Sequence, residues 1–149
     1  TVEQVVTMGM YTELGWLRRA NAAHRSRVME VLDRVGIADL AKRQISELSG
    51  GQRRRVFVAR ILVQAPELYL LDEPFAGVDA ASERVIRGVL HELRDQGATI
   101  VIVHHDLSTV AELCDHVTIL NREIIATGPT SEAFTRENIT KAFGLGLLE

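Results

Sequence analysis

Two short, almost continuous apolar runs constrain the fold more than any other feature of the sequence. LYLL covers residues 68–71 and TIVIV covers residues 99–103. Asp79 and Gly97 stand where a helix between the two runs would begin and end. The apolar face of that helix would consist of Val85, Ile86, Val89, Leu90 and Leu93. A helix between two such runs predicts an α/β fold with a parallel sheet, whose strands we expect to be buried on both faces.

The first 48 residues predict helices only, so we place a helical subdomain at residues 1–48 and the rest of the core at 49–149. One apolar stripe falls at helical spacing, and Gly36 is a natural end for that helix. Its members are Val28, Val31, Leu32 and Val35. After the second strand we expect a short helix, a hairpin around Asn121 and Arg122, and a terminal helix opened by PTSEAFT.

Composition excludes several classes of function. The chain has 149 residues, of which 46% are hydrophobic and 25% are charged, so it can bury a core. A net charge of -3 argues against broad nucleic-acid binding. No apolar run approaches the roughly 18 residues that span a membrane, so we expect no direct membrane insertion. The single cysteine, Cys114, falls at helical spacing with Leu107, Val110 and Ala111, which predicts a reduced core residue and suits the cytosol.

Polar residues follow both predicted strands, at the sheet edge where ligands bind in open α/β folds. Asp72 and Glu73 follow the first strand, and His104 and His105 follow the second. A carboxylate at a strand end can hold Mg²⁺, and a second carboxylate can orient or deprotonate a water molecule. The alternative is that the two acids cap the turn at Pro74. Adjacent strand residues point to opposite faces, so the histidines would not chelate one metal, and one of them is better placed as a phosphate contact.

The stretch LSGGQRRR, residues 48–55, places glycines at a predicted helix start. Main-chain N–H groups of Gly50 and Gly51, the Ser49 hydroxyl and the Gln52 amide could bind a phosphate there, and the helix dipole favours an anion. Three arginines follow, where positive charge opposes the dipole. They indicate either a bound anion or a solvated helix face. Asp79 likewise is either a functional residue or a simple helix cap.

Together these segments resemble the nucleotide-binding subunits of ATP-binding cassette (ABC) transporters. LSGGQ at residues 48–52 matches the signature motif, and LYLLDEP, AGVD and HHD resemble the Walker B motif, the D-loop and the switch histidine. The ordered set is much more specific than any one of these motifs. The resemblance implies a P-loop NTPase-like fold, with the helical signature subdomain first and the second half of the parallel-sheet catalytic core after it.

The resemblance also implies roles for individual residues. Asp72 would support Mg²⁺ and Glu73 would be the catalytic base. Asp79 would be the D-loop aspartate that communicates across a dimer. Ser49, Gly50, Gly51 and Gln52 would face the γ-phosphate of ATP. His105 is favoured as the switch histidine because it precedes Asp106, whereas His104 stands where Thr or Ser is usual.

Small departures from the family pattern accompany one larger difference. AGVD replaces the commoner SALD, and Arg53 and Arg54, which could simply be solvated, stand where Gln or Lys is frequent. Arg55 matches an arginine common in the family. The sequence contains no G-x-x-x-x-G-K-[ST] run, and it opens at Thr1 inside an apolar pattern, so we expect a piece of a longer protein.

In this family two subunits pair head to tail, and each signature motif completes the partner's ATP site. The implied cofactors are therefore ATP and Mg²⁺, and the implied partners are a second ATPase subunit and membrane permease subunits. We expect that this polypeptide by itself neither binds ATP tightly nor hydrolyses it. We also expect exposed sheet edges that favour self-association.

Two runs, LGWLRRANAAHRSRVMEVLDRVGI and DHVTILNREIIATGPTSEAFT, are similar to ATPase subunits of manganese, zinc and iron importers. The resemblance thus predicts the ATPase subunit of a metal-ion importer at the cytoplasmic face of the plasma (inner) membrane. One alternative is a non-hydrolysing interaction module that supplies LSGGQ to a partner. Another is a soluble ABC protein of translation or repair, although those usually carry tandem cassettes or long insertions.

Overall fold

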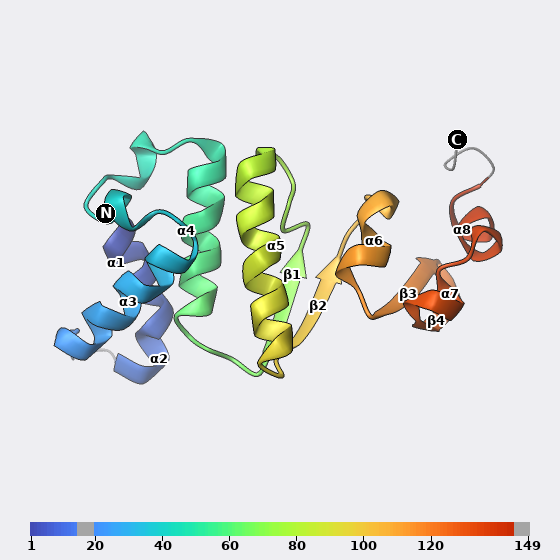
Figure 1. The fold of residues 1–149 in the computed structure, drawn as a ribbon, viewed down its shortest axis with the longest axis horizontal. Helices are drawn as coiled ribbons and strands as arrows, with labels where there is room; N and C mark the ends of the chain where they lie inside the picture. Colours follow the sequence, from blue (N-terminus) through green and yellow to red (C-terminus); the bar gives the residue numbers. More distant parts are fainter. Residues whose placement is uncertain (15–19, 145–149) are drawn as a thin grey trace. The chain divides into compact units, whose positions relative to one another are not determined.

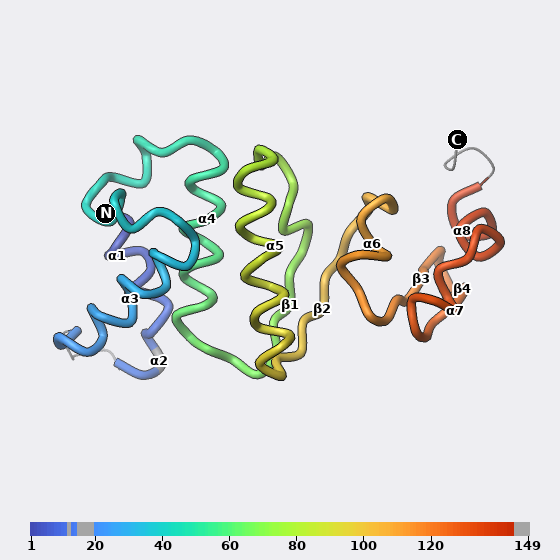
Figure 2. Tube along the Cα trace, in the orientation of Figure 1, coloured from blue at the N-terminus to red at the C-terminus, as the bar shows by residue number. Residues whose placement is uncertain are grey.

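The computed structural model describes residues 1–14 and 20–144 (Figures 1 and 2). Residues 15–19 of the run LGWLRR lie outside the described residues. The chain forms two compact units, Thr1–Val103 and His104–Glu149.

The first unit begins with short helices and two longer helices of 13 residues each, α3 and α4. Helix α1 contacts both α3 and α4 (Figure 1). The elements are α1 (Val2–Thr7), η1 (Met8–Met10), α2 (Tyr11–Leu14), α3 (Ala22–Arg34), η2 (Ala38–Leu40), η3 (Ile45–Glu47) and α4 (Gly50–Leu62). Among the described residues up to Leu48 the only regular elements are helices, as predicted, and the boundary of the helical subdomain stays a prediction.

Helix α3 follows the predicted pattern closely. Asn21 caps its start by accepting a hydrogen bond from the His24 main-chain N–H at 3.0 Å. All four residues of the predicted apolar stripe are buried, namely Val28, Val31, Leu32 and Val35. Gly36 has φ +66°, a conformation that glycine adopts readily, and the helix ends just before it.

The second part of this unit is the predicted βαβ arrangement. Strand β1 (Leu68–Asp72) and strand β2 (Thr99–Val103) pair in parallel, with Leu68 opposite Thr99 and Asp72 opposite Val103. Helix α5 (Ala80–Asp95) connects them and lies beside α4 (Figure 1). The buried residues of α5 are Ser82, Ile86, Val89, Leu90 and Leu93, whereas Val85 of the predicted apolar face is half-buried.

The expectation that both strands are buried on both faces is wrong. Alternate residues of a strand point to opposite faces, and here only one face is covered. Tyr69 is 3% exposed, whereas Leu70 is 70% exposed and Val103 is 60% exposed. Helix α5 packs against β2, but the face that carries Leu70 and Val103 is open among the described residues of this unit.

The second unit holds a helix, an antiparallel hairpin and two terminal helices. Its elements are α6 (Leu107–Leu113), β3 (His116–Asn121), β4 (Glu123–Pro129), α7 (Thr130–Ala133) and α8 (Arg136–Phe143). Ile119, Ile139 and Ala142 form its buried cluster. The hairpin is confirmed, and Arg122 makes its tight turn with φ +59°.

Two details of this unit differ from the sequence-based expectations. Ala111 is exposed, and Cys114 is half-buried just beyond the end of α6, so the predicted apolar stripe is incomplete. The terminal helix is divided, because the Thr135 hydroxyl caps a new helix by accepting from the Asn138 N–H at 3.2 Å. Over the described parts of the chain, every helix is too short or too polar to cross a membrane.

Candidate functional site

The start of α4 carries the LSGGQ residues in a reciprocal cap. The Ser49 hydroxyl accepts a hydrogen bond from the Gln52 main-chain N–H at 3.2 Å, and the Gln52 side chain accepts one from the Ser49 N–H at 2.9 Å. Ser49 and Gly50 are exposed. The first N–H groups of a helix lack partners within the helix, so Gly50 and Gly51 present donors at the positive end of the dipole. This geometry can bind an anion.

Gly51 also allows two helices to meet closely. A Cβ atom at this position would lie 2.3 Å from Asp79 Oδ2 and 2.6 Å from Ser82 Oγ. Real Cβ atoms do not approach other atoms so closely. The start of α4 therefore packs directly on the start of α5, and this packing requires glycine at position 51.

Asp79 is the N-cap of α5, as one of its two interpretations predicted. Its Oδ1 atom accepts a hydrogen bond from the Ser82 N–H at 2.8 Å, and its Oδ2 atom accepts one from the Ser82 hydroxyl at 2.8 Å. These hydrogen bonds, that from the main-chain N–H first, hold the pKa of Asp79 below its usual value of 3.8. The carboxylate is therefore charged at neutral pH, and a role for it across a dimer stays a prediction.

Asp72 is the last residue of β1 and lies at the open face of the sheet. Asp72 is exposed, and its carboxylate makes no hydrogen bond or ion pair with the described residues. The interpretation of Asp72 as a turn cap therefore fails. A free carboxylate with room for water around it fits the ligand preference of Mg²⁺. No cluster of three or more His, Cys, Asp or Glu suited to a metal occurs in residues 1–14 and 20–144.

Glu73 adopts a left-handed main-chain conformation in this turn. Its φ is +46°, which is uncommon for a residue other than glycine and costs about 1–3 kcal/mol. Its N–H donates to the Val103 carbonyl at 3.0 Å, and its own carbonyl accepts from the Ala76 N–H at 3.1 Å. The side chain is half-buried. Residues at strained main-chain positions are common in active sites, so this conformation agrees with a functional role.

The three adjacent arginines have different surroundings, which the sequence did not predict. Arg54 donates hydrogen bonds to main-chain carbonyls of the turn after β1, including that of Pro74 at 3.0 Å. Arg55 donates to the carbonyls of Val35 at 3.3 Å and Gly36 at 3.1 Å, at the end of α3. Arg53 is exposed. Of the three arginines, only Arg53 therefore fits the interpretation of a solvated helix face. The hydrogen-bond partners of Arg54 and Arg55 are 18 to 20 residues distant in sequence.

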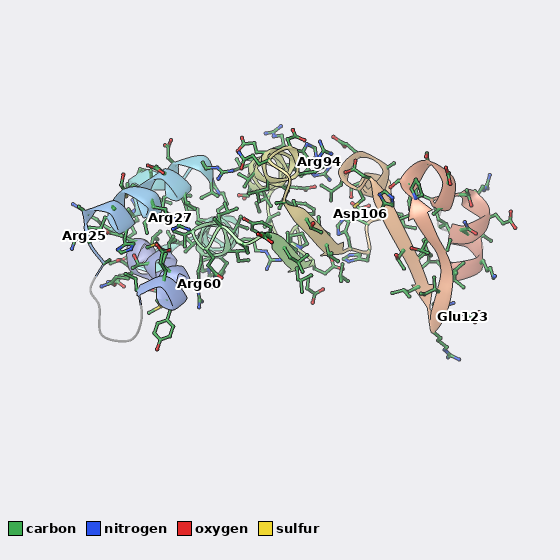
Figure 3. All side chains as sticks on the ribbon, turned by 90° about the horizontal axis from the view of Figure 1, so that it is seen from below. Arg25, Arg27, Arg60, Arg94, Asp106 and Glu123 are labelled. Carbon is green, nitrogen blue, oxygen red and sulfur yellow. The ribbon has the colours of Figure 1, made fainter. Side chains whose placement is uncertain are left out.

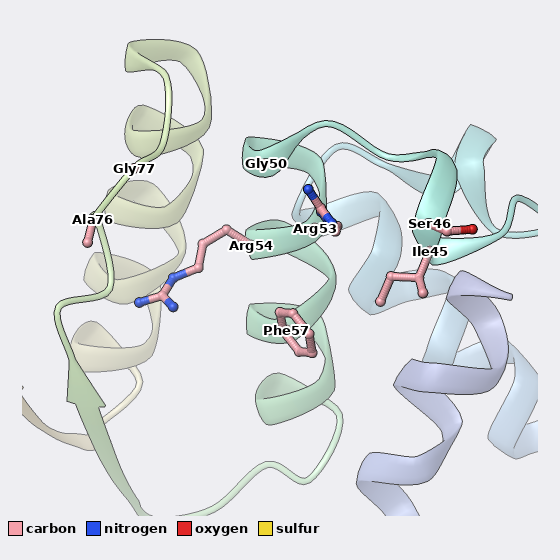
Figure 4. A pocket seen from close by; sticks show the side chains of 8 residues that line it. All are labelled: Ile45, Ser46, Gly50, Arg53, Arg54, Phe57, Ala76 and Gly77. Atoms are coloured by element: carbon pink, nitrogen blue, oxygen red, sulfur yellow. The ribbon is translucent and has the colours of Figure 1, made fainter.

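An open hollow of about 660 Å³ lies beside these arginines (Figure 4). It is bounded by η3, by the first half of α4 and by the segment between β1 and α5. The residues that line it are Ile45, Ser46, Gly50, Arg53, Arg54, Phe57, Ala76 and Gly77. It gives solvent access to the exposed end of the LSGGQ helix and to the AGVD segment on the same side of the unit.

The second unit opens with His104 and His105. Both follow the end of β2, so they are not strand residues as the argument against chelation assumed. His104 Nε2 lies 3.0 Å from the Thr109 hydroxyl, whereas His105 is exposed. Asp106 caps α6 by accepting from the Ser108 N–H at 3.0 Å. The exposed ring of His105 agrees with a contact to a ligand, and its role as switch histidine stays a prediction.

The half-buried thiol of Cys114 is protonated at neutral pH. Burial raises its pKa above the usual 9.0, and the nearby Asp115 carboxylate adds to the effect. A raised pKa makes the thiol a weak nucleophile. The prediction of a core residue is only partly met, because Cys114 is half-buried.

Similarity to known proteins extends over nearly the whole chain. Over 144 residues it is 50% identical to the zinc transport system ATP-binding protein TroB of Treponema pallidum, a match that covers 97% of this chain and 54% of that protein. It is 49% identical over 140 residues to the manganese transport system ATP-binding protein MntB of Bacillus subtilis, covering 94% of this chain and 56% of the relative. The chain thus spans about half the length of the curated relatives it matches.

Solved structures and a family model agree with these relatives. A metal-chelate type ABC transporter in an inward-facing conformation matches with a TM-score of 0.88 at 30% identity, covering 96% of this chain and 57% of the other. Protein cbiO1 of Clostridium perfringens, part of the ABC transporter complex cbiONQ, matches with a TM-score of 0.75 at 32% identity, covering 99% and 58%. The family model described as ABC transporter matches residues 2–76. The chain therefore belongs to the ABC transporter family, among its ATP-binding proteins.

Proposed function

We propose that this chain is part of an ATP-hydrolysing subunit of an ABC importer for manganese, zinc or iron. One observation carries the proposal: the LSGGQ, DEP and AGVD segments meet within the first unit. There Gly51 lies against Asp79, and the Arg54 side chain binds the main chain that follows β1. The zinc and manganese transport relatives, nearly 50% identical, support the metal-ion substrate.

In the proposed reaction, the start of α4 binds the γ-phosphate of an ATP molecule held by a second subunit. The N–H groups of Gly50 and Gly51, the Ser49 hydroxyl and the Gln52 amide are the donors. Because Ser49 and Gln52 cap each other in this structure, the helix start is already ordered for that contact. Preorganised donors stabilise phosphoryl transfer without further rearrangement.

Glu73 acts as the general base in this proposal, and Asp72 holds Mg²⁺ together with water and phosphate oxygens. The bound Mg²⁺ would supply charge neutralisation at the phosphates. Glu73 accepts a proton from the attacking water. Asp72 is the last residue of β1 and Glu73 is the first residue after it, so one main-chain segment sets the direction of the base and the position of the metal ligand.

Two further residues complete the proposed machinery. His105 contacts the γ-phosphate as the switch histidine, which its exposed ring would permit. Asp79 transmits the closed state of the dimer through the D-loop while it caps α5. LSGGQ and Glu73 of one subunit would serve two different composite sites, because the pair is arranged head to tail.

The proposed partners are a second ATPase subunit and the membrane permease subunits. The protein would lie at the cytoplasmic face of the plasma (inner) membrane, held there by the permease. ATP with Mg²⁺ is the proposed nucleotide. We propose no contact with nucleic acid.

The test uses the full-length protein that contains this chain, reconstituted with its permease in vesicles. We expect MgATP hydrolysis and ATP-dependent uptake of Mn²⁺ or Zn²⁺. Replacement of Ser49 by Arg in both subunits should abolish hydrolysis, because the larger side chain fills the phosphate position. ATP binding without hydrolysis by the wild-type pair would instead support the non-hydrolysing interaction module.

A second measurement concerns the chain alone. Isothermal titration calorimetry with MgATP should detect tight binding to the full-length protein and none to the 149-residue chain. Measurable Mg²⁺-dependent turnover by the isolated chain would contradict the division of the ATP site between parts of the protein.

A further inference from the structure

The Arg54 side chain crosses from α4 to the turn that follows β1 (Figure 4). Its Nε atom donates a hydrogen bond to the Pro74 carbonyl at 3.0 Å. Its Nη2 atom donates to the Asp72 carbonyl at 3.2 Å and also to the Glu73 carbonyl. One guanidinium group therefore binds three consecutive peptide carbonyls.

These three carbonyls belong to the part of the turn with the unusual conformation. Glu73 has φ +46°, and such a conformation persists only where the surroundings hold it. The Glu73 N–H is held by the Val103 carbonyl of β2 at 3.0 Å. The Glu73 carbonyl accepts hydrogen bonds from the Arg54 side chain and from the Ala76 N–H. The direction in which the Glu73 side chain leaves the main chain thus depends on Arg54.

Helix α5 holds the next residue of the same turn. The guanidinium carbon of Arg87 lies 5.4 Å from the centre of the Phe75 ring, within the range of a cation–π contact. Arg87 is oriented by Glu83, whose Oε1 atom accepts from Nη2 at 2.7 Å. The end of the turn is therefore fixed from α5, and Arg54 is the side chain of α4 that fixes its beginning.

We propose that Arg54 is a positioning residue for the Glu73 carboxylate. It binds the peptide groups around Glu73 and thereby aims that carboxylate at the attacking water. This inference rests on the proposed function, because it concerns the efficiency of the base. It also links the LSGGQ helix to the base of the same subunit, since Arg54 follows Gln52 by two positions on α4.

This contact depends on the arrangement of N–H donors in the arginine side chain more than on its positive charge. A guanidinium group presents several N–H donors in a fixed plane, whereas a lysine ammonium is a compact point donor on a flexible stem. Lysine at position 54 could bind one carbonyl but not all three in the observed arrangement. The neighbouring arginines cannot replace Arg54, because Arg53 is exposed and Arg55 binds the end of α3.

The first test measures steady-state ATP hydrolysis by the full-length protein with its permease. We expect Arg54→Ala to lower kcat about 10- to 100-fold, the scale expected when a reacting group is misplaced by about 1 Å. The KM for ATP should change little, because the Arg54 guanidinium is bound to main-chain carbonyls of its own chain. Arg54→Lys, which keeps the charge and most of the packing, should recover part of kcat.

Arg60 provides the matched control, since it is an exposed arginine in the last turn of the same helix (Figure 3). Arg60→Ala should leave kcat unchanged. Melting temperatures of all variants show whether a loss of activity reflects unfolding. If Arg54→Ala does not fold, the comparison of Arg54→Lys with wild type decides the question.

A double-mutant cycle with Glu73→Gln separates positioning from a general structural effect. If Arg54 acts through the Glu73 carboxylate, Arg54→Ala should cause little further loss in the Glu73→Gln background. An equal fold loss in both backgrounds, or an unchanged kcat in an active Arg54→Ala protein, would overturn the proposal. A wild-type protein without ATP turnover would refute the proposed function, and the role of Arg54 would fall with it.

Discussion

Two segments that follow parallel strands carry the candidate chemistry, and they are held in different ways. After β1, the main chain at Glu73 is bound by Arg54, which is 19 residues earlier in the sequence. After β2, the described bonds of His104 and Asp106 reach Thr109 and Ser108, at most five residues away. The first segment therefore depends on the packing of α4 against the rest of its unit. The second has caps that its own local sequence provides.

The largest expected effect concerns the base in the first segment. Glu73→Gln should lower the kcat of the full-length protein by about 10²- to 10⁴-fold, because general base catalysis contributes on that scale. ATP binding should persist. Glu123→Gln, at an exposed site in the hairpin, is the matched control and should leave kcat unchanged (Figure 3). A Glu73→Gln protein with wild-type turnover would show that the segment after β1 does not supply the base.

The next effect concerns the contact between α4 and α5 that supports the first segment. Gly51→Ala should destabilise the full-length protein by about 1–3 kcal/mol, because the added Cβ atom overlaps Asp79 and Ser82. Urea denaturation measures the change. Gly88→Ala, at a site on α5 where an added Cβ atom meets nothing within 4 Å, should instead stabilise by about 0.5–1 kcal/mol. Equal effects of the two changes would contradict the close contact.

A smaller effect is expected in the second segment. Thr109→Val removes the hydroxyl that contacts His104 at 3.0 Å and donates to the Asp106 carbonyl at 3.2 Å. The expected loss of stability is about 0.5–1.5 kcal/mol. Thr99→Val is the control, because Thr99 is exposed on β2 and its side chain makes no hydrogen bond to the described residues. If Thr109→Val lowered the stability as much as Gly51→Ala does, the two segments would not differ in the way that we infer.

The smallest effect is a pH dependence at Cys114. Its folded pKa lies above the value of 9.0 expected for the unfolded thiol. The thiol therefore leaves stability unchanged below that pH and reduces it as the pH rises further, because the unfolded chain ionises first. Ellman's reagent should also react more slowly with the folded protein than with the urea-unfolded protein. Equal rates would show that burial does not protect this thiol.

Local rules predicted much of the fold. The apolar runs gave β1 and β2, Asp79 is the cap of α5, and Gly36 stands at the end of α3. Each of these features depends on residues within a few positions of one another. Arg122 in the hairpin turn is a further example.

The features that the sequence did not predict depend on distant parts of the chain. The open face at Leu70 reflects which elements cover the sheet, and no periodicity within β1 encodes that. The bonds from Arg54 and Arg55 join segments separated by 18 to 20 residues. In the candidate site, the residue types at the strand ends were predictable, but the side chain that fixes the turn around Glu73 was not.

Amide hydrogen exchange tests most directly whether a distant side chain holds the first segment. In the full-length protein, Arg54→Ala should accelerate exchange at Ala76 and Val78, whose N–H groups bond within the turn, and leave the hairpin of β3 and β4 unchanged. Unchanged exchange at Ala76 and Val78 in a folded Arg54→Ala protein would contradict the account, because the turn would then be stable without Arg54.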